Sequence, residues 1–261
     1  MPLKTIQLLS SPQRSIKANY QLGAFLAFVA GAINAGGFLA INRYTSHMSG
    51  IISAIGDDLV LGNLMPAIVG AVLLCSFLCG AATTTLLVHW GKRRKIRSQY
   101  ALPLLLEAFV LLLFGLLGSY LSTYIQLTIP AIIFLLCFVM GLQNAIVTKM
   151  SRAEIRTTHM TGVVTDIGIE IGRMLYWNKS ELANKYRYVK FNELKLKLHL
   201  LILGMFVTGA LIGSIAFKKA GYISVLPISI SLAIIALSPI YRDLKRVFIK
   251  SSTALKLKVF T

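Results

Sequence analysis

Six long apolar segments alternate with shorter polar stretches along the chain. A helix that crosses about 30 Å of hydrocarbon needs roughly 20 residues at 1.5 Å per residue. Each of the six segments is close to that length or longer: Asn19–Ile41, Leu64–His89, Ala101–Tyr124, Thr128–Thr148, Leu198–Phe217 and Tyr222–Ile240. The pattern therefore predicts an all-α, polytopic membrane helix bundle with six transmembrane helices.

The basic residues decide whether two shorter and more polar stretches, Ser46–Leu61 and Thr157–Trp177, also cross the membrane. Lys and Arg collect in short cytoplasmic loops. With six spans and a cytoplasmic N-terminus, 24 of the 27 Lys and Arg residues lie inside, and only Arg43, Lys218 and Lys219 lie outside. If both stretches crossed, the basic cluster at 92–97 would move outside. We therefore expect six spans, cytoplasmic termini and two short helices that do not cross.

The chain also contains an internal repeat. Residues 31–35 (GAINA) match residues 141–145 (GLQNA), and residues 46–50 (SHMSG) match residues 158–162 (THMTG). Each half holds three spans, so the second half enters the membrane from the side opposite to the first. The sequence thus predicts two inverted three-helix repeats, each with an extra short helix.

These boundaries divide the chain into regions. We expect a cytoplasmic N-terminal tail at 1–17, a first membrane repeat at 18–124, a second at 128–240 and a basic cytoplasmic tail at 241–261. The second repeat contains an amphipathic cytoplasmic insert at 178–197.

Composition excludes two classes of protein. Of the residues, 56% are apolar and 14% are charged, and the mean hydropathy is +0.73, whereas a soluble domain carries roughly a quarter charged residues. An ordinary water-soluble enzyme and a disordered chain are both excluded. The net charge of +18 would suggest nucleic acid in a soluble protein, but topology accounts for it. We expect no nucleic-acid partner, and we expect the basic insert and tail to bind anionic lipid head groups.

Several motifs resemble those of a known family. The doubled His-Met-Ser/Thr-Gly motif, residues 141–145 and the segment LLLEA at 104–108 are similar to the YoaK-like family of bacterial inner-membrane proteins of unknown function. The resemblance covers residues 20–240. It implies a multi-span fold in the bacterial cytoplasmic membrane and assigns no substrate.

Inverted repeats with a discontinuous helix in each half are an architecture of secondary transporters. The leading hypothesis is a small-solute transporter or permease for a polar or anionic metabolite, with its site where the two His-Met-Ser/Thr-Gly helices face each other. The alternative is a non-transporting scaffold or lipid-binding protein. A membrane enzyme ranks third, because the sequence has no Walker loop, zinc-binding spacing or nucleophile motif. We therefore expect no enzymatic activity, cofactor, metal site or catalytic residue.

The repeated motif supplies the candidate binding residues. Thr45 or Ser46, and their counterparts Thr157 or Thr158, suit the N-cap of each short helix. A helix N-terminus favours anions, and an amide in each half can form hydrogen bonds with a solute or across helices. The candidates are Asn34, His47, Ser49, Gly50, Asn144, His159, Thr161 and Gly162. The alternative for each histidine is a packing residue near a helix cap.

Four acids are candidates for proton or ion coupling: Asp58, Glu107, Asp166 and Glu170. In the second short helix, two carboxylates one turn apart need a cation, a shared proton or a basic partner such as Arg156 or Arg173 if the helix is inserted. A helix lying in the interface with its acids in water needs none of these. Glu107 lies inside a span, and the alternative to a polar cavity is that it snorkels toward Arg97.

Two further features bear on packing. Cys75, Cys79 and Cys137 all fall in apolar spans, so we expect no disulfide. The pattern Gly209-x-x-x-Gly213 permits close helix packing, either within the chain or in a homo-oligomer.

Overall fold

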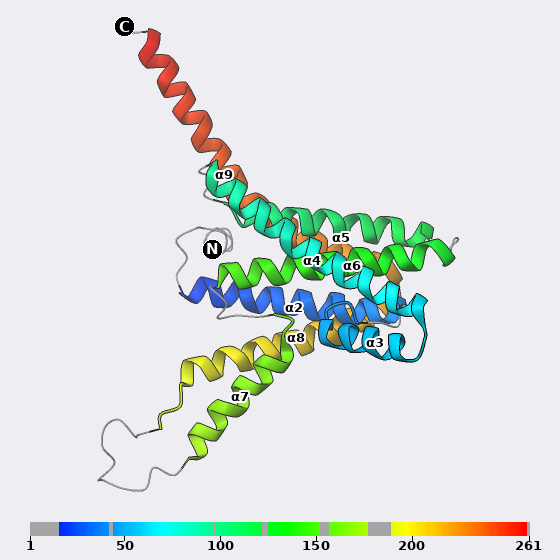
Figure 1. Cartoon of the computed structure of the whole chain (residues 1–261). Helices are drawn as coiled ribbons and strands as arrows, with labels where there is room; N and C mark the ends of the chain where they lie inside the picture. The colour runs from blue at the N-terminus through cyan, green and yellow to red at the C-terminus, as the bar shows by residue number, and fades with distance from the viewer. Residues whose placement is uncertain are drawn as a thin grey trace, which may run out of the picture.

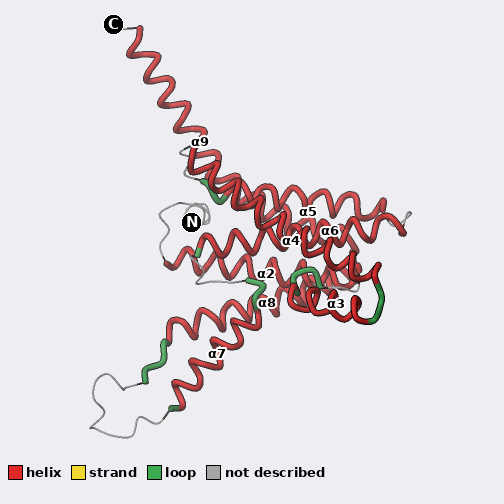
Figure 2. The backbone as a smooth tube through the Cα atoms, in the orientation of Figure 1, coloured by secondary structure: helices red, strands yellow, loops and turns green. Residues whose placement is uncertain are grey.

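The computed structural model describes residues 16–41, 44–94, 96, 98–121, 125–151, 157–176 and 189–259. Within them the chain forms helices and no strand (Figures 1 and 2). The elements are α2 (Ile16–Ile41), α3 (Met48–Val60), α4 (Leu64–Arg93), α5 (Ala101–Leu121), α6 (Ile125–Met150), α7 (Met160–Leu175), α8 (Glu193–Ala220), the short 3-10 helix η1 (Gly221–Val225) and α9 (Leu226–Val259).

Four described stretches of helix are long and apolar enough to cross a membrane: Tyr20–Leu39, Leu64–Arg93, Ala131–Met150 and Glu193–Tyr241. The last contains 49 residues and passes through α8, η1 and α9, which is more than twice the roughly 20 residues that one crossing needs. The described apolar part of α5, Ala101–Leu116, is shorter. A helical membrane protein is therefore confirmed, and six crossings stay a prediction.

The long helices pack in pairs around α2 and α6. Helix α2 packs on α8, α6 packs on α4, α5 packs on α9, and α2 and α6 also touch each other. Four glycines mark the two closest crossings, because a Cβ atom at each would overlap a carbonyl oxygen of the facing helix. They are Gly31 against Phe206, Gly209 against Phe28, Gly80 against Phe138 and Gly141 against Phe77. The α2–α8 crossing and the α6–α4 crossing thus use matching residues of the two sequence repeats.

The last helix is longer than the predicted span. Helix α9 continues without a break from Leu226 to Val259, so the expected boundary at residue 240 is not marked by the end of a helix (Figure 1). Most of the predicted insert, residues 177–188, and residues 1–15 of the predicted N-terminal tail lie outside the described residues.

Candidate functional site

Two asparagines tie the start of each short helix to the long helix before it. Oδ1 of Asn34 accepts hydrogen bonds from the backbone N–H of Ser46 at 3.3 Å and from its hydroxyl at 2.9 Å. Oδ1 of Asn144 accepts a hydrogen bond from the hydroxyl of Thr158. The repeat predicts that these residues are equivalent, and they make equivalent contacts.

The same contacts correct the predicted helix starts. Helices α3 and α7 begin at Met48 and Met160, and their N-cap positions are occupied by His47 and His159 without a side-chain capping bond. Ser46 and Thr158 do not cap, because their hydroxyls bond to the asparagines. Thr45 and Thr157 do not cap either, since both are buried and neither hydroxyl has a hydrogen-bond partner among the described residues.

We call the hydrogen bonds Asn34–Ser46 and Asn144–Thr158 the tethers. They set how far along each long helix the following short helix begins. Asn34 lies seven residues before the end of α2, about 10 Å along the axis at 1.5 Å per residue. Asn144 lies six residues before the end of α6, about 9 Å by the same measure. Helix α3 then runs back beside α4, which it joins through a turn at Gly62 with φ 77°. Each short helix therefore starts within the length of a long helix rather than at its end.

The short helices expose many apolar side chains. The large ones include Ile52 and Leu59 on α3 and Val164, Ile171 and Met174 on α7, and Asp57 and Arg173 are exposed on the same helices. Apolar patches are uncommon on surfaces that meet water. Part of the surface of each short helix is therefore suited to contact hydrocarbon.

Each motif histidine lies over the glycine one turn further along its helix. A Cβ atom at Gly50 would overlap the imidazole of His47, and one at Gly162 would overlap the imidazole of His159. A side chain at either glycine would therefore displace the ring, a shift that a flexible imidazole can make. Ser49 and Thr161, the hydroxyl residues of the two motifs, are exposed.

The two short helices pack on different long helices. Helix α3 packs on α4 and α7 packs on α8, and in Figure 1 the two short helices extend from the middle of the bundle toward opposite ends. Each short helix therefore has its own neighbours, and the single site between the two motifs stays a prediction.

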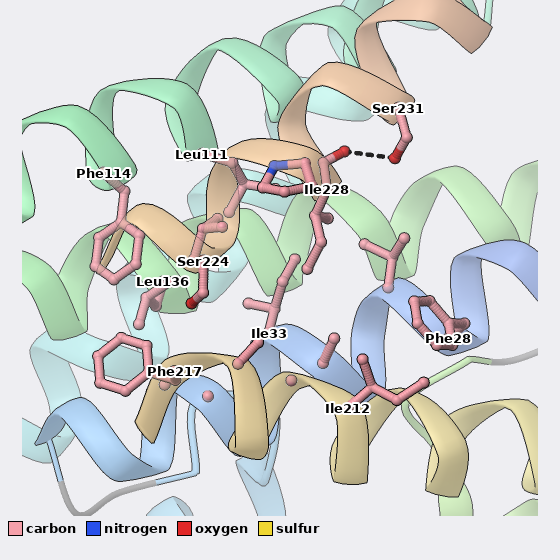
Figure 3. A pocket seen from close by; sticks show the side chains of 18 of the residues that line it. Phe28, Ile33, Leu111, Phe114, Leu136, Ile212, Phe217, Ser224, Ile228 and Ser231 are labelled. Atoms are coloured by element: carbon pink, nitrogen blue, oxygen red, sulfur yellow. Dashed lines mark hydrogen bonds between the residues drawn. The ribbon is translucent and has the colours of Figure 1, made fainter. Parts of the chain in front are cut away.

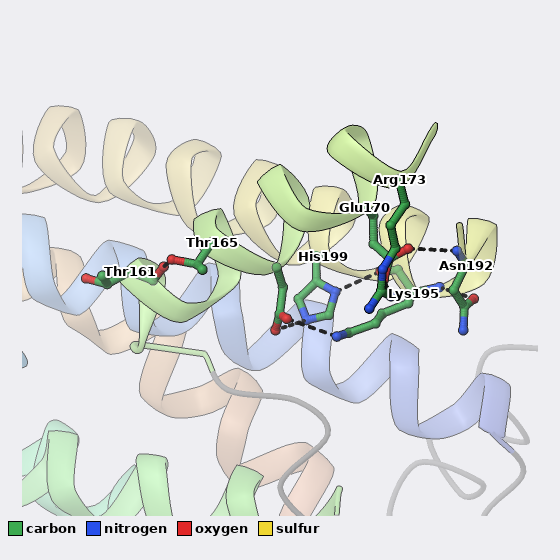
Figure 4. A network of polar contacts seen from close by, with 8 residues as sticks. Thr161, Thr165, Glu170, Arg173, Asn192, Lys195 and His199 are labelled. Atoms are coloured by element: carbon green, nitrogen blue, oxygen red, sulfur yellow. Dashed lines mark hydrogen bonds and ion pairs between the residues drawn. The ribbon is translucent and has the colours of Figure 1, made fainter. Parts of the chain in front are cut away.

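In the second half, Glu170 is fully enclosed between α7 and α8. Its carboxylate accepts a hydrogen bond from the guanidinium of Arg173 at 2.8 Å and another from the backbone N–H of Asn192 at 2.7 Å (Figure 4). Arg173 is one of the two basic partners that the sequence suggests. Arg156 lies outside the described residues.

Asp166 is paired across the same interface. Its carboxylate lies 2.9 Å from the ammonium of Lys195 and 3.4 Å from Nε2 of His199. Nδ1 of His199 lies 2.8 Å from the backbone oxygen of Lys195, so the imidazole bridges α8 and α7. Two acids one turn apart are thus each matched with a basic group, as an inserted helix requires.

In the first half, an open groove of about 350 Å³ runs along α3. We call it the α3 groove. One wall is formed by His47, the N-cap residue of α3, and by Gly50, Ala54 and Asp58 of α3. The remaining lining residues are Ile51 and Ile55 of α3, Phe38 of α2, Tyr44, and Pro66 and Gly70 of α4.

A second cavity of about 300 Å³ lies inside the bundle, between α2, α5, α6, α8, η1 and α9. Figure 3 shows mainly apolar side chains around it, among them Ile33, Phe114 and Phe217. Its two hydroxyls, on Ser224 and Ser231, bond to backbone oxygens of Gly221 and Ile228. The cavity is therefore apolar in character and contains no residue of α3 or α7.

Glu107 on α5 is fully buried, and neither carboxylate oxygen has a hydrogen-bond partner among the described residues. It therefore does not reach a described cation, and Arg97 lies outside the described residues. A buried, unpaired carboxylate is costly in hydrocarbon. Gln143 on α6 is also fully buried. Its Nε2 donates to the backbone oxygen of Leu26 at 3.0 Å, while its Oε1 has no described partner.

Sequence reasoning missed the partners of Asp166. It assigned Lys195 to a lipid-facing insert and His199 to a span end, whereas both face α7. A further match between the two repeats, Phe77 with Phe206, could have shown where α8 begins. It aligns Asn63 with Asn192, which are the N-cap residues of α4 and α8.

Comparison with known proteins gives a family. A family model described as "Protein of unknown function (DUF1275)" matches residues 22–238. The UPF0700 transmembrane protein YoaK of Bacillus subtilis (strain 168) is 28% identical over 161 residues, which cover 60% of this chain and 69% of that protein. No solved structure matches the chain.

Proposed function

This chain belongs to the DUF1275 family, whose members include YoaK-like transmembrane proteins, and we propose that it is a transporter or permease for a small polar or anionic solute. The proposal rests on one observation. Both short helices begin within the length of the preceding long helix, at the tethers Asn34–Ser46 and Asn144–Thr158. In secondary transporters, half-helices that begin inside the membrane direct their N-termini at substrate. Here these N-termini carry His47 and His159.

The arrangement we propose is two inverted repeats in the bacterial inner membrane, with six crossings and cytoplasmic termini. The matched glycine crossings support the repeat, since Gly31 and Gly141 each meet a phenylalanine backbone at equivalent points. The distribution of Lys and Arg supports the orientation. The basic segments then lie where they can attract anionic lipid head groups.

Proton or ion coupling would use the acids near the short helices. Asp166, Lys195 and His199 form a cluster of ionisable side chains, and the aspartate side chain is 35% exposed. Glu170 is held by Arg173. Asp58 lines the α3 groove. Glu107, on the long helix α5, is fully buried.

One observation favours a second function. The cavity of about 300 Å³ is lined mainly by apolar side chains and is the kind of space that an acyl chain fills. A lipid-binding protein without transport would use this cavity and leave the short helices with a structural role.

The test is metabolite profiling of cells that contain the protein, lack it, or contain the variant with His47→Ala and His159→Ala. A transporter changes the distribution of one or a few polar solutes between cells and medium, and the variant restores the pattern of cells without the protein. Equal profiles in all three, with both proteins present in the membrane, would overturn the proposal.

A further inference from the structure

The two halves differ most in the space beside their short helices. Aligning α3 with α7 at an offset of 112, and α4 with α8 at an offset of 129, pairs each groove residue on these two helices with a residue of the second half. Three of these pairs change chemistry: Ala54 with Asp166, Pro66 with Lys195 and Gly70 with His199. A fourth pair, Asp58 with Glu170, keeps a carboxylate.

In the second half, side chains of the protein fill this space. The Lys195 stem extends from α8 to place its ammonium 2.9 Å from Asp166, and His199, which is 4% exposed, lies against the same carboxylate (Figure 4). The groove between α7 and α8 thus holds an internal ammonium against an acid of the short helix.

In the first half, the corresponding side chains are absent. Pro66 and Gly70 offer neither an ammonium nor an imidazole, and the space is an open groove of about 350 Å³. The acid that pairs with Lys195 is absent too, since Ala54 stands at the position of Asp166. Asp58, the counterpart of Glu170, lines the groove and forms no ion pair with any residue that the structure describes. The volume lies within the range of small-molecule pockets.

The rest of the groove suits an apolar body. Ile51 and Ile55 line it along α3, and Phe38 and Tyr44, which also line it, stack with ring centroids 4.5 Å apart. His47, the N-cap residue of α3, and Asp58 are eleven residues apart, about 16 Å at 1.5 Å per residue. The groove therefore offers a carboxylate, an aromatic pair and apolar side chains.

We propose that the α3 groove binds an amphipathic organic amine, whose ammonium pairs with Asp58 and whose apolar body lies against Ile51, Ile55 and the aromatic pair. A charge-assisted hydrogen bond fixes the ammonium, and burial of the apolar body adds affinity. Binding of the amine does not rest on the proposed function. Transport of the amine does rest on it and would extend its solutes to a cationic, amphipathic molecule.

The test measures binding of 4-phenylbutylamine to the purified full-length protein in detergent by isothermal titration calorimetry. The neutral 4-phenylbutanol reports how much of the binding depends on the charge. Asp58→Asn removes the carboxylate and keeps its shape. Asp57→Asn is the matched control, because Asp57 is the neighbouring acid, exposed and outside the groove.

We expect the native protein and Asp57→Asn to bind the amine equally, and Asp58→Asn to bind it at least tenfold more weakly. The alcohol should also bind the native protein at least tenfold more weakly than the amine. The double variant Ala54→Asp with Pro66→Lys, which copies the second half, should lose amine binding because its own ammonium fills the groove.

Equal amine affinity in Asp58→Asn and Asp57→Asn, or equal affinity for amine and alcohol, would overturn the proposal. Thermal unfolding of each variant separates loss of the site from loss of the fold. Flux of the amine into proteoliposomes is measured separately. Binding without flux would retain the site and refute transport of the amine, whereas flux of another solute without amine binding would retain transport and refute the site.

Discussion

Replacing Gly209 with alanine should destabilise the protein, because this position has no space for a methyl group. Gly209 lies on α8 at the crossing with α2, where an added Cβ atom would overlap the carbonyl oxygen of Phe28 and come within 2.9 Å of its Cα atom. These are backbone atoms, so neither can move without shifting the whole of α2. Overpacking of this kind costs about 1–3 kcal/mol.

The same helix contains the matched control. A Cβ atom at Gly204 would have no neighbour within 4 Å, so Gly204→Ala changes only helix propensity and should stabilise the protein by roughly 0.5–1 kcal/mol. The two substitutions are chemically identical and lie five residues apart, yet the structure predicts opposite signs.

Thermal unfolding of the two variants and the native protein in the same detergent measures this difference. A loss of 1 kcal/mol lowers the Tm by about 2–4 °C for a chain of this size, so the order should be Gly204→Ala, then native, then Gly209→Ala. If Gly209→Ala unfolds at or above the native Tm, the close α2–α8 crossing is wrong. Gly141→Ala at the α6–α4 crossing should behave like Gly209→Ala.

Three further predictions concern the polar groups. Glu170→Gln should lower the free energy of unfolding by about 1–3 kcal/mol, because it weakens two hydrogen bonds to a fully buried carboxylate, whereas Glu193→Gln, at an exposed ion pair, should leave the Tm unchanged; equal Tm values for both variants would contradict the enclosed network. His47→Ala and His159→Ala should each reduce solute flux, and if both residues face one site their effects on the free-energy scale should not add in the double variant; additive effects would instead indicate two independent sites. Asp166→Asn should flatten the pH dependence of flux, which is measured in proteoliposomes between pH 5 and 8, where histidine titrates, and an unchanged profile would remove Asp166 from coupling.

The sequence predicted the helices well because the apolar runs are long and the repeat is clear. It also predicted the equivalence of Asn34 and Asn144, which make matching hydrogen bonds. It assigned both residues to hydrogen bonds with substrate or across helices, and the structure shows bonds from each to the segment before a short helix. A repeat identifies equivalent positions, but the geometry of the folded chain decides which group each side chain meets.

The partners of the second short helix could not be predicted in the same way. Lys195 lies 29 residues from Asp166, and the intervening segment gives no periodicity that relates α7 to α8. The nearby Arg173 was predictable because it lies three residues after Glu170 on one helix, a spacing that brings side chains together. The start of each short helix was misplaced because Ser46 and Thr158 had an alternative partner on a distant helix.

Labelling of single cysteines from each side of the membrane tests the central claim most directly, namely that the two short helices belong to inverted repeats. Leu61 and Tyr176 are the C-cap residues of α3 and α7 and are 72% and 59% exposed, so each position accepts a cysteine. The native Cys75, Cys79 and Cys137 are first replaced by alanine. With a membrane-impermeant maleimide, Leu61→Cys should react in intact spheroplasts, and Tyr176→Cys should react only after permeabilisation. Reaction of both cysteines from the same side would contradict the inverted arrangement.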